Sequence, residues 1–472
     1  MLLGIIIIRS REYQYLFLLL ASYFFYYYSS GSLFVLVIYI TLLNYFCARA
    51  LASVENQKIR KIYFIVGIIG SLSTLALFKY TDFAIKTVNA LGSWLGYSAN
   101  LSLLHLILPI GISFYTFQAI SYLIEVYKKK LEPEKSLLDF ALYMTFFPHL
   151  LAGPIVRAAD FLPQLKKDII TITSDNFRRG LTLILWGLVK KVVIADNVAQ
   201  FVVVFFDDPT KFPGSLPVIL GAVAFAIQVY CDFSGYTDIA IGLARIMGIH
   251  FPMNFDKPFF SKSLAEFWKR WHISLSTWFR DYIFQPIVTS GERFTVRRLY
   301  FAVMVVYVIS GLWHGAGWTF IIWGALHGFF LVVGMMTENI RRKFTNFIGL
   351  TKVPKIHAFV KTMITLYLIL FPLLVFRLYH TQNILSTARK FLIIDFSNFA
   401  EQWHSVFPVF QIPLFFFLMF IIVHTITYFK KDFLEKLEEK GVFEWTMYLT
   451  GMIVLLYFFA PSQSMPYVYF QF

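Results

Sequence analysis

Cysteine and charged residues are both scarce in this sequence. Its 472 residues include only two cysteines, Cys47 and Cys231, each inside an apolar run, which argues against a disulfide framework or a thiolate metal site. Charged residues make up 15% and hydrophobic residues 58%, and no long polar stretch suggests a separate soluble domain. Because a membrane-spanning helix needs about 20 mostly apolar residues, this composition predicts an integral membrane protein with many spans.

Acidic residues are fewer than basic ones, so the chain is strongly basic. Lysine and arginine number 42 against 27 aspartates and glutamates, which gives a formal charge of +15. These cations lie in short loops between apolar runs, as the positive-inside rule describes, so the charge indicates topology rather than nucleic-acid binding. It predicts that the N-terminus and the loops 49–61 and 128–135 face the cytoplasm. The start "MLLGIIII" lacks a small-residue cleavage pattern and predicts no removable signal peptide.

The apolar runs predict an all-α polytopic fold of about ten to twelve transmembrane and re-entrant helices. We find no inverted repeat of the kind that marks many secondary transporters. Prolines and glycines within 139–163 predict a broken or re-entrant helix, and 264–284 is too charged for a lipid-exposed span. The predicted helical runs are 13–28, 33–46, 62–80, 101–127, 139–156, 180–206, 216–247, 299–312, 318–336, 357–376, 408–429 and 443–460.

The charged stretch "SLAEFWKRWHISLSTWFRDYIF" (263–284) begins with a helix signal. Ser263 and Glu266 form the S-x-x-E capping box, and Glu266 and Arg270 have the i, i+4 spacing of an ion pair. Two readings stay open: an amphipathic helix at the membrane interface, and a helix that lines a wet cavity inside the protein. The residues near one face of a continuous helix are Trp268, His272 and Phe279, with Ser276 beside them.

An apolar run upstream, "QVYCDFSGYTDIAIGLARIMG" (228–248), carries polar groups inside a predicted helix. Ser234, Asp238 and Arg245 share one face of that helix. A carboxylate in such a place needs a partner, so we predict a structural ion pair between Asp238 and Arg245. Asp232 points to another face and is a candidate for lining a cavity.

The most unusual stretch is "GLWHGAGW" (311–318), which ends an apolar run. Its glycines, Gly311, Gly315 and Gly317, remove side chains around His314, which predicts room for a ligand and a break in the helix. Irregular backbone in a membrane is tolerated mainly where it lines a cavity. Three interpretations of His314 compete: a buried structural histidine, a lining residue of a transport path, and a catalytic base. No H-x-x-x-H or H-E-x-x-H spacing indicates a metal site.

Motifs for a protein nucleophile or a nucleotide are also missing. The sequence has no G-x-S-x-G elbow, Walker loop or dinucleotide fingerprint, so nothing indicates a serine hydrolase, an ATPase or a dehydrogenase. A histidine alone can take the proton from a hydroxyl that attacks an activated acyl group such as a thioester, while nearby donors stabilise the oxyanion. We therefore hypothesise direct acyl transfer with His314 as the base, and with His272 and His327 as further titratable groups.

Together, four long motifs resemble the membrane-bound O-acyltransferase (MBOAT) family, in particular the bacterial branch that includes the alginate O-acetyltransferase membrane subunit. The later "VFRL" (375–378) and "YVYFQF" (467–472) are also similar to that branch, and the resemblance runs from about residue 14 to the last residue. The four motifs are "FPHLLAGPIVRAADFLPQL" (147–165), "DFSGYTDIAIGLARIMGIHFPMNFDKPF" (232–259), "FWKRWHISLSTWFRDYIFQPI" (267–287) and "SGLWHGAGWTFIIWGALHG" (310–328).

The resemblance implies a single membrane domain over residues 1–472, built around a central tunnel, with its catalytic core within 228–328. It implies that His314 matches the principal catalytic histidine, that His272 matches the second active-site position, and that His327 is a further histidine of this branch. Trp313 and Trp318 are expected to line the tunnel, with ordinary aromatic packing as the alternative. The other candidates for lining the tunnel or binding the donor are Trp268, Asp232 and Ser276.

The resemblance also implies the reaction and its setting, the inner membrane of a bacterium. Acetyl-CoA is the implied donor substrate, an exopolysaccharide or other surface glycan is the acceptor, and no bound cofactor or metal is implied. A hydrolase-like partner outside the cytoplasm is expected to complete the transfer. Two rivals stay open: a D-alanyl transferase of the same family, which takes its acyl group from a carrier-protein thioester to load teichoic acid, and a transporter with His272 and His314 lining its path.

Three departures from the family pattern stand out. The apolar segment before "YQYLFLLLASYFF" is reduced to "MLLGIIII", so we expect that the true start lies further upstream. The turn after "FQPI" reads "VTSGERF", and Thr319 follows "GAGW". None of these departures removes a candidate catalytic histidine, but the last two are expected to bear on substrate preference.

Overall fold

The structure is a computed structural model that describes residues 2–97, 100–166, 170–291, 293–378, 383–430, 433, 436 and 439–468. The predicted motif "YVYFQF" lies outside the described residues from 469 onward, as does residue 292 within "VTSGERF". Across the described residues the regular structure is helical throughout. Eight helical stretches there are long and apolar enough to cross a membrane. The predicted all-α, polytopic membrane fold is therefore confirmed.

The chain forms two compact units. The first comprises residues 1–184 and 240–252, and the second comprises 185–239 and 253–472. Two of the three boundaries fall inside helices, α10 (Ser174–Leu188) and α12 (Leu216–Ile246), each of which contributes to both units, and the third follows residue 252 in a loop. The single domain expected from the sequence stays a prediction.

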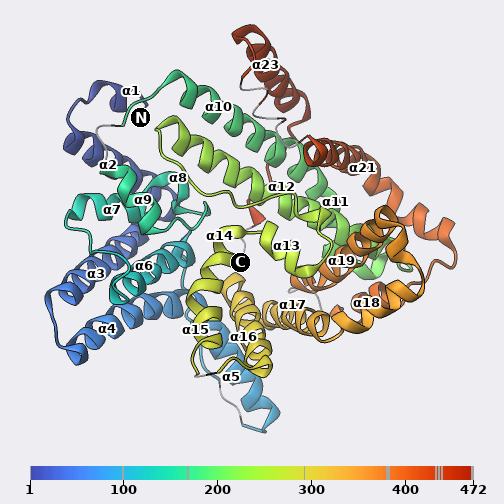
Figure 1. Ribbon diagram of the computed structural model, residues 1–472. Coiled ribbons are helices and arrows are strands. Elements are labelled where there is room, and N and C mark those ends of the chain that lie inside the picture. The colour runs from blue at the N-terminus through green and yellow to red at the C-terminus, as the bar shows by residue number, and fades with distance from the viewer. Residues whose placement is uncertain are drawn as a thin grey trace. The chain divides into compact units, whose positions relative to one another are not determined.

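In the first unit, α2, α3, α4, α6 and α7 pack side by side, in blue to teal in Figure 1. The apolar helix α6 is buried along almost its whole length and packs against α3, α4 and α7. The elements of this unit, besides its parts of α10 and α12, are α1 (Leu2–Ile7), α2 (Arg11–Ser30), η1 (Gly31–Leu33), α3 (Phe34–Ser53), α4 (Gln57–Leu75), η2 (Ala76–Tyr80), α5 (Thr81–Trp94), α6 (Ile112–Tyr127), α7 (Leu137–Thr145), α8 (Phe147–Leu150) and α9 (Ala158–Leu165).

Two predicted segments of this unit have different outcomes. The predicted run 101–127 is wrong in its first part, because the helix begins only at Ile112. Pro109 precedes this start, and Gly111 has a φ of 78°, a left-handed conformation that packs its Cα against the backbone of Leu150. The predicted break within 139–163 is confirmed, since that region divides into α7, α8 and α9.

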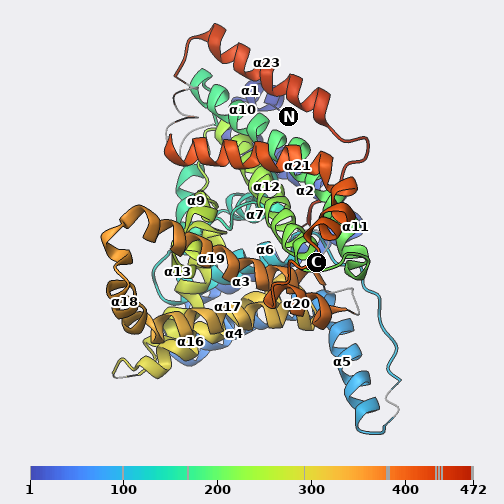
Figure 2. The same ribbon diagram turned by 90° about the vertical axis from the view of Figure 1, so that its right-hand side faces the viewer.

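In the second unit, α17 packs against both α16 and α19, as Figure 2 shows in yellow to orange. The elements of this unit, besides its parts of α10 and α12, are η3 (Val189–Ala195), α11 (Asp196–Asp207), η4 (Pro209–Lys211), η5 (Pro258–Phe260), α13 (Leu264–Arg270), α14 (Ile273–Phe279), η6 (Arg280–Phe284), α15 (Gln285–Val288), α16 (Val296–His314), α17 (Trp318–Met336), α18 (Glu338–Phe347), η7 (Leu350–Lys352), α19 (Pro354–Arg377), α20 (Ile384–Leu392), α21 (Phe399–Phe429) and α23 (Val442–Phe459).

Glycines allow α16 and α17 to approach closely. A Cβ atom added to Gly311 would collide with the carbonyl oxygen of Phe320, and one added to Gly324 would collide with that of Tyr307. Small residues at such a contact bring two helix backbones together, which is the usual way helices associate in a membrane. This pairing fixes the end of α16, where His314 lies, against the first turns of α17.

Candidate active site

The charged stretch 263–284 starts as predicted but is not one helix. Ser263 Oγ accepts a hydrogen bond from the backbone N–H of Glu266 at 3.1 Å, and the Glu266 carboxylate pairs with Arg270 at 2.8 Å. The helix α13 then ends at Arg270, and α14 begins at Ile273. His272 lies between them with φ 45° and ψ 54°, a left-handed backbone conformation that residues other than glycine rarely adopt. The prediction of a single helix is therefore wrong at His272.

The break at His272 is stabilised by a neighbouring segment. The backbone N–H of Ile273 donates to the carbonyl oxygen of Asn254 at 2.9 Å, and that of Asp256 donates to the carbonyl oxygen of Arg270 at 2.9 Å. These bonds replace helical ones on both sides of the break. Strained backbone at a buried histidine persists only where its surroundings enforce it, and such strain gathers at functional sites.

The side chain of Asn254 also orients the His272 ring. Its Oδ1 accepts from the backbone N–H of Ser274 at 3.0 Å and from Ser274 Oγ at 2.9 Å, so this atom is an acceptor. It lies 3.3 Å from His272 Nδ1. His272 Nδ1 therefore carries the proton and Nε2 is the basic nitrogen. His272 is 1% exposed, and this burial, followed by the nearby His314, holds the pKa of His272 well below its ordinary value.

His314 is the last residue of α16, and Gly315 follows it in an extended conformation. The predicted break in the helix is thus confirmed. The ring of Trp313 contacts both histidines in edge contacts, 5.8 Å from the ring of His272 and 5.1 Å from that of His314. His314 is partly exposed, whereas Trp313 is 3% exposed. The structure therefore brings together two of the predicted catalytic histidines through one tryptophan.

The glycines around His314 do not leave the room that the sequence predicts. Gly311 serves the close packing of α16 on α17, and the ring of Phe320 fills the space beside Gly315 and reaches Gly317. The reason is that the side chain of Phe320, the third residue of α17, packs over the end of α16. Glycine at these positions accommodates a neighbouring aromatic ring and backbone.

A second group of rings extends from His314 to the third predicted histidine. Trp323 lies 4.9 Å from His314 and 4.8 Å from His327, between ring centroids. His327 is 2% exposed and also contacts Trp268, at 5.1 Å. We call Trp268, Trp323 and His327 the indole–histidine cluster. Sequence reasoning missed Trp323, although its spacing of four residues from His327 places both on one face of a helix.

Two other predicted residues are Trp318 and Ser276. Trp318 begins α17 and is 58% exposed, which suits the outer surface of a membrane protein. Ser276 donates from its hydroxyl to the carbonyl oxygen of Trp271 at 3.2 Å, a bond local to α14. Whether either residue lines a tunnel stays a prediction.

The predicted ion pair between Asp238 and Arg245 is wrong in its partner. Asp238 pairs with Lys190 on η3, at 2.7 Å. Asp238 and Arg245 are seven residues apart, about 10 Å along a helix axis. Gly187 of α10 and Gly235 of α12 let these two helix backbones touch, which brings Lys190, just after α10, beside α12. Close packing thus supplies a nearer cation.

Asp232 belongs to a buried ionic group, and whether it also lines a donor site stays a prediction. Lys191 Nζ lies 2.7 Å from Asp232 and 2.8 Å from Asp196, and the three side chains are at most 7% exposed. Lys191 also donates to the carbonyl oxygen of Met465 at 2.8 Å, and Asp232 accepts from the backbone N–H of Val468 at 2.8 Å. This Lys191 triad anchors the segment 465–468 to the second unit.

The first unit holds another buried histidine that sequence reasoning did not single out. His149 is 3% exposed, and its Nε2 lies 3.1 Å from the amide nitrogen of Gln118. Gln118 in turn donates to the carbonyl oxygen of Tyr143 at 2.8 Å. Burial lowers the pKa of His149 to about 3, so this ring is neutral. The motif "FPHLLAGPIVR" contained the signal, a histidine among apolar residues and prolines.

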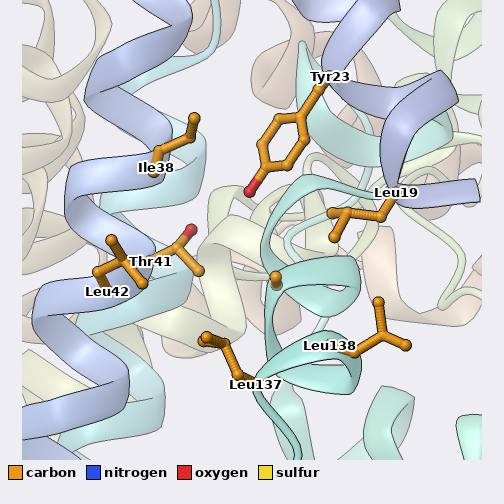
Figure 3. Close-up of a pocket in the computed structure, with 8 residues that line it drawn as sticks. Leu19, Tyr23, Ile38, Thr41, Leu42, Leu137 and Leu138 are labelled. Atoms are coloured by element: carbon orange, nitrogen blue, oxygen red, sulfur yellow. The ribbon is translucent and has the colours of Figure 1, made fainter. Parts of the chain in front are cut away.

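A cavity of about 290 Å³ also lies in the first unit, between α2, α3 and α7 (Figure 3). Tyr23 and Thr41 supply its polar atoms, and Thr41 Oγ1 is already bonded to the carbonyl oxygen of Val37 at 2.6 Å. Its lining holds no base or acid suited to acyl transfer near neutral pH. The lining residues are Leu19, Tyr23, Ile38, Thr41, Leu42, Leu137, Leu138 and Ala141.

Comparison with known proteins decides the family. The model of the membrane-bound O-acyltransferase family matches residues 133–381, more than half of the chain. The chain belongs to the membrane-bound O-acyltransferase family. As a member of this family it is a membrane O-acyltransferase, so the predicted enzyme class is confirmed and the transporter alternative is set aside.

Relatives in this family are similar over most of the chain. The probable alginate O-acetylases AlgI of Azotobacter vinelandii and Pseudomonas aeruginosa are 40% and 37% identical over 70% and 79% of this chain, which spans 65% and 69% of their lengths. A peptidoglycan O-acetyltransferase of Helicobacter pylori is 37% identical over 64% of this chain and 60% of its own. More distantly, a teichoic acid D-alanyltransferase of Bacillus subtilis is 30% identical over 51% of this chain and 62% of its own.

Proposed function

We propose that this chain is an O-acetyltransferase that moves an acetyl group from cytoplasmic acetyl-CoA to a surface glycan. The observation that carries the proposal is that His272 and His314 both contact the ring of Trp313, with His272 held at a strained break between two helices. The names of the alginate and peptidoglycan relatives favour acetyl as the group and a surface polysaccharide as the acceptor.

In this proposal His314 is the base. An acceptor hydroxyl attacks the thioester carbonyl carbon, and His314 takes the hydroxyl proton as the new C–O bond forms. When the tetrahedral intermediate collapses, the C–S bond breaks and His314 returns the proton to the leaving thiolate. His272, neutral because it is buried, positions the acyl group or shares the proton through its basic Nε2.

The setting of the reaction follows from the same proposal. We place the chain in a bacterial inner membrane, with its N-terminus and the basic loops 49–61 and 128–135 in the cytoplasm. The donor then enters from the cytoplasmic side, and a hydrolase-like partner outside the cytoplasm completes transfer to the polysaccharide. No bound cofactor or metal takes part in the proposed reaction.

The alternative within the family is D-alanyl transfer from a carrier-protein thioester to teichoic acid. The similarity to the Bacillus subtilis D-alanyltransferase supports this alternative. The identity is lower than for the acetylases, 30% against 40%, and extends over a smaller share of the chain. Acetyl transfer is therefore the better supported of the two.

The test measures ester-linked acetate on isolated surface polysaccharide. It compares cells with the native chain, without the chain, and with His314→Ala at matched membrane abundance. A matched control is His404→Ala, which changes an exposed histidine on α21. We expect acetate to disappear in the deletion and in His314→Ala and to persist in the control.

Other outcomes would contradict parts of the proposal. Acetate that persists in His314→Ala but not in the deletion would remove His314 from the mechanism. Acetate that persists even in the deletion would contradict acetyl transfer to that polysaccharide. Ester-linked D-alanine, measured in the same samples, would then distinguish the alternative.

A further inference from the structure

The indole–histidine cluster contains three ring nitrogens that the protein does not satisfy. Trp268, Trp323 and His327 are 8%, 5% and 2% exposed. The buried atoms Trp268 Nε1, Trp323 Nε1 and His327 Nδ1 make no hydrogen bond to any described part of the chain. Nearly all buried polar groups in proteins are hydrogen-bonded, and each exception calls for an explanation.

These three rings belong to one place in the second unit. The centroids of Trp268 and Trp323 are 5.8 Å apart, and each ring contacts His327, at 5.1 and 4.8 Å. Trp268 comes from α13, whereas Trp323 and His327 come from α17. Three rings that each carry an unsatisfied nitrogen therefore pack together from two helices, and a common cause is more economical than three separate packing faults.

The chemistry of the nitrogens indicates what they bind. An indole N–H only donates hydrogen bonds, so two of the three groups require an acceptor atom on a ligand. The cluster adjoins the proposed base, because the Trp323 ring lies 4.9 Å from the His314 ring. A reacting acyl group beside His314 offers one strong acceptor, its carbonyl oxygen, which gains negative charge as the hydroxyl attacks.

We propose that the indole N–H groups of Trp268 and Trp323 hydrogen bond to the acyl carbonyl oxygen during transfer and stabilise the charge that develops on it. Donors of this kind are most effective in a site that excludes water, and both indoles are buried. His327 packs against both indoles and holds them in place. This inference rests on the proposed acyl transfer and adds two catalytic residues to it.

The experiment uses membrane vesicles from the native cells that contain the full chain, the proposed hydrolase-like partner and the native polysaccharide. The probe is radiolabelled acetyl-CoA, and the initial rate of ester-linked acetate formation gives kcat and KM for each variant. Trp268→Phe and Trp323→Phe each keep an aromatic ring and remove the N–H donor. Trp278→Phe is the matched control, a tryptophan of α14 that is 4% exposed and lies outside the cluster.

We expect each cluster variant to lower kcat by about 100- to 1,000-fold, the usual effect of removing one oxyanion donor. KM for acetyl-CoA is expected to stay near the native value, because the bond strengthens only as charge develops. The Trp278→Phe control is expected to keep the native kcat. A purely structural role would instead lower the amount of folded chain and leave kcat per folded molecule unchanged.

Two results would overturn the inference. The first is a kcat for both cluster variants within about twofold of the control, in an assay where His314→Ala is inactive. The second is a loss of rate that follows the loss of folded protein on size-exclusion chromatography. The variants are tested singly, so one that fails to accumulate leaves the other informative. A His314→Ala variant that stays active would instead contradict the proposed function itself.

Discussion

Lys191→Met removes the cation that Asp196 and Asp232 share. Both carboxylates lie within 2.8 Å of Lys191 Nζ, and their side chains are 3% and 2% exposed. Breaking a buried ion pair by removing one partner costs about 3–5 kcal/mol, because the remaining charge is buried without compensation. We expect a loss of this size in the free energy of unfolding of the second unit, together with loss of the hydrogen bond to Met465.

The loss is expected to depend on pH in a defined direction. Burial already raises the pKa of Asp196 above its ordinary value, and removal of Lys191 raises it further. A carboxyl whose pKa is higher in the folded state binds more protons there, so stability falls as pH rises. The defect of Lys191→Met is therefore expected to be larger at pH 8 than at pH 5.5.

Two assays in detergent measure the effect. Thermal unfolding followed by tryptophan fluorescence reports global stability, and maleimide labelling of Val468→Cys reports release of the 465–468 segment. Val468 is 5% exposed and the native Cys47 and Cys231 are buried, so a protected thiol is the starting state. We expect Lys191→Met to speed up labelling.

A matched variant separates charge from packing. Lys191→Met combined with Asp196→Asn and Asp232→Asn removes all three charges, and replacing a whole buried ionic group is often close to neutral. We expect this triple variant to recover most of the lost stability. The reasoning is refuted if Lys191→Met unfolds at the native temperature while position 468 stays protected.

Three further predictions follow from the geometry. Asn254→Ala removes the acceptor that orients the ring of His272. We expect kcat to fall by about 100-fold, as for other small misplacements of a group in an active site, with protein abundance unchanged. Gly324→Ala places a methyl group against the carbonyl oxygen of Tyr307 and should destabilise the protein by about 1–3 kcal/mol. Gly334→Ala, on the same helix with open space around it, should not; equal melting temperatures would contradict this. The pKa of His149 is lowered to about 3, so its ring stays neutral in the folded protein while the unfolded chain takes up a proton below pH 6.5. The free energy of unfolding should therefore fall as pH is lowered, by at most about 1.4 kcal/mol per pH unit. His149→Gln should reduce this slope of melting temperature against pH, and an unchanged slope would count against the role of His149.

The membrane class, the family and the start of the charged helix were all predictable from local sequence. Apolar runs of sufficient length identify spans, and Ser263 with Glu266 identifies a helix start, which the hydrogen bond between them confirms. The break at His272 was not predictable in this way, since neither glycine nor proline marks it. It depends on hydrogen bonds that the carbonyl oxygen of Asn254 accepts and the backbone N–H of Asp256 donates, and such tertiary bonds override local propensity.

Partners distant in sequence account for the other errors. Asp238 had a plausible partner seven residues away, but Lys190 lies 48 residues away in sequence and 2.7 Å away in space. The glycines near His314 suggested open space because nothing in the sequence places the ring of Phe320 beside Gly315. Periodicity identifies which side chains share a face of one helix, but not which side chain of another helix fills the gap.

The Lys191 triad also sets an order of events during biosynthesis. Asp232 bonds to Val468, which is 236 residues further along the chain. At about 5–20 residues per second, ribosomes need about 10–50 seconds to synthesise this interval. During that time Lys191, Asp196 and Asp232 have been synthesised, but the segment 465–468 that covers them has not. The second unit therefore reaches its native state only after translation of its last described residues, which gives membrane quality control a defined period in which to recognise an unfinished chain.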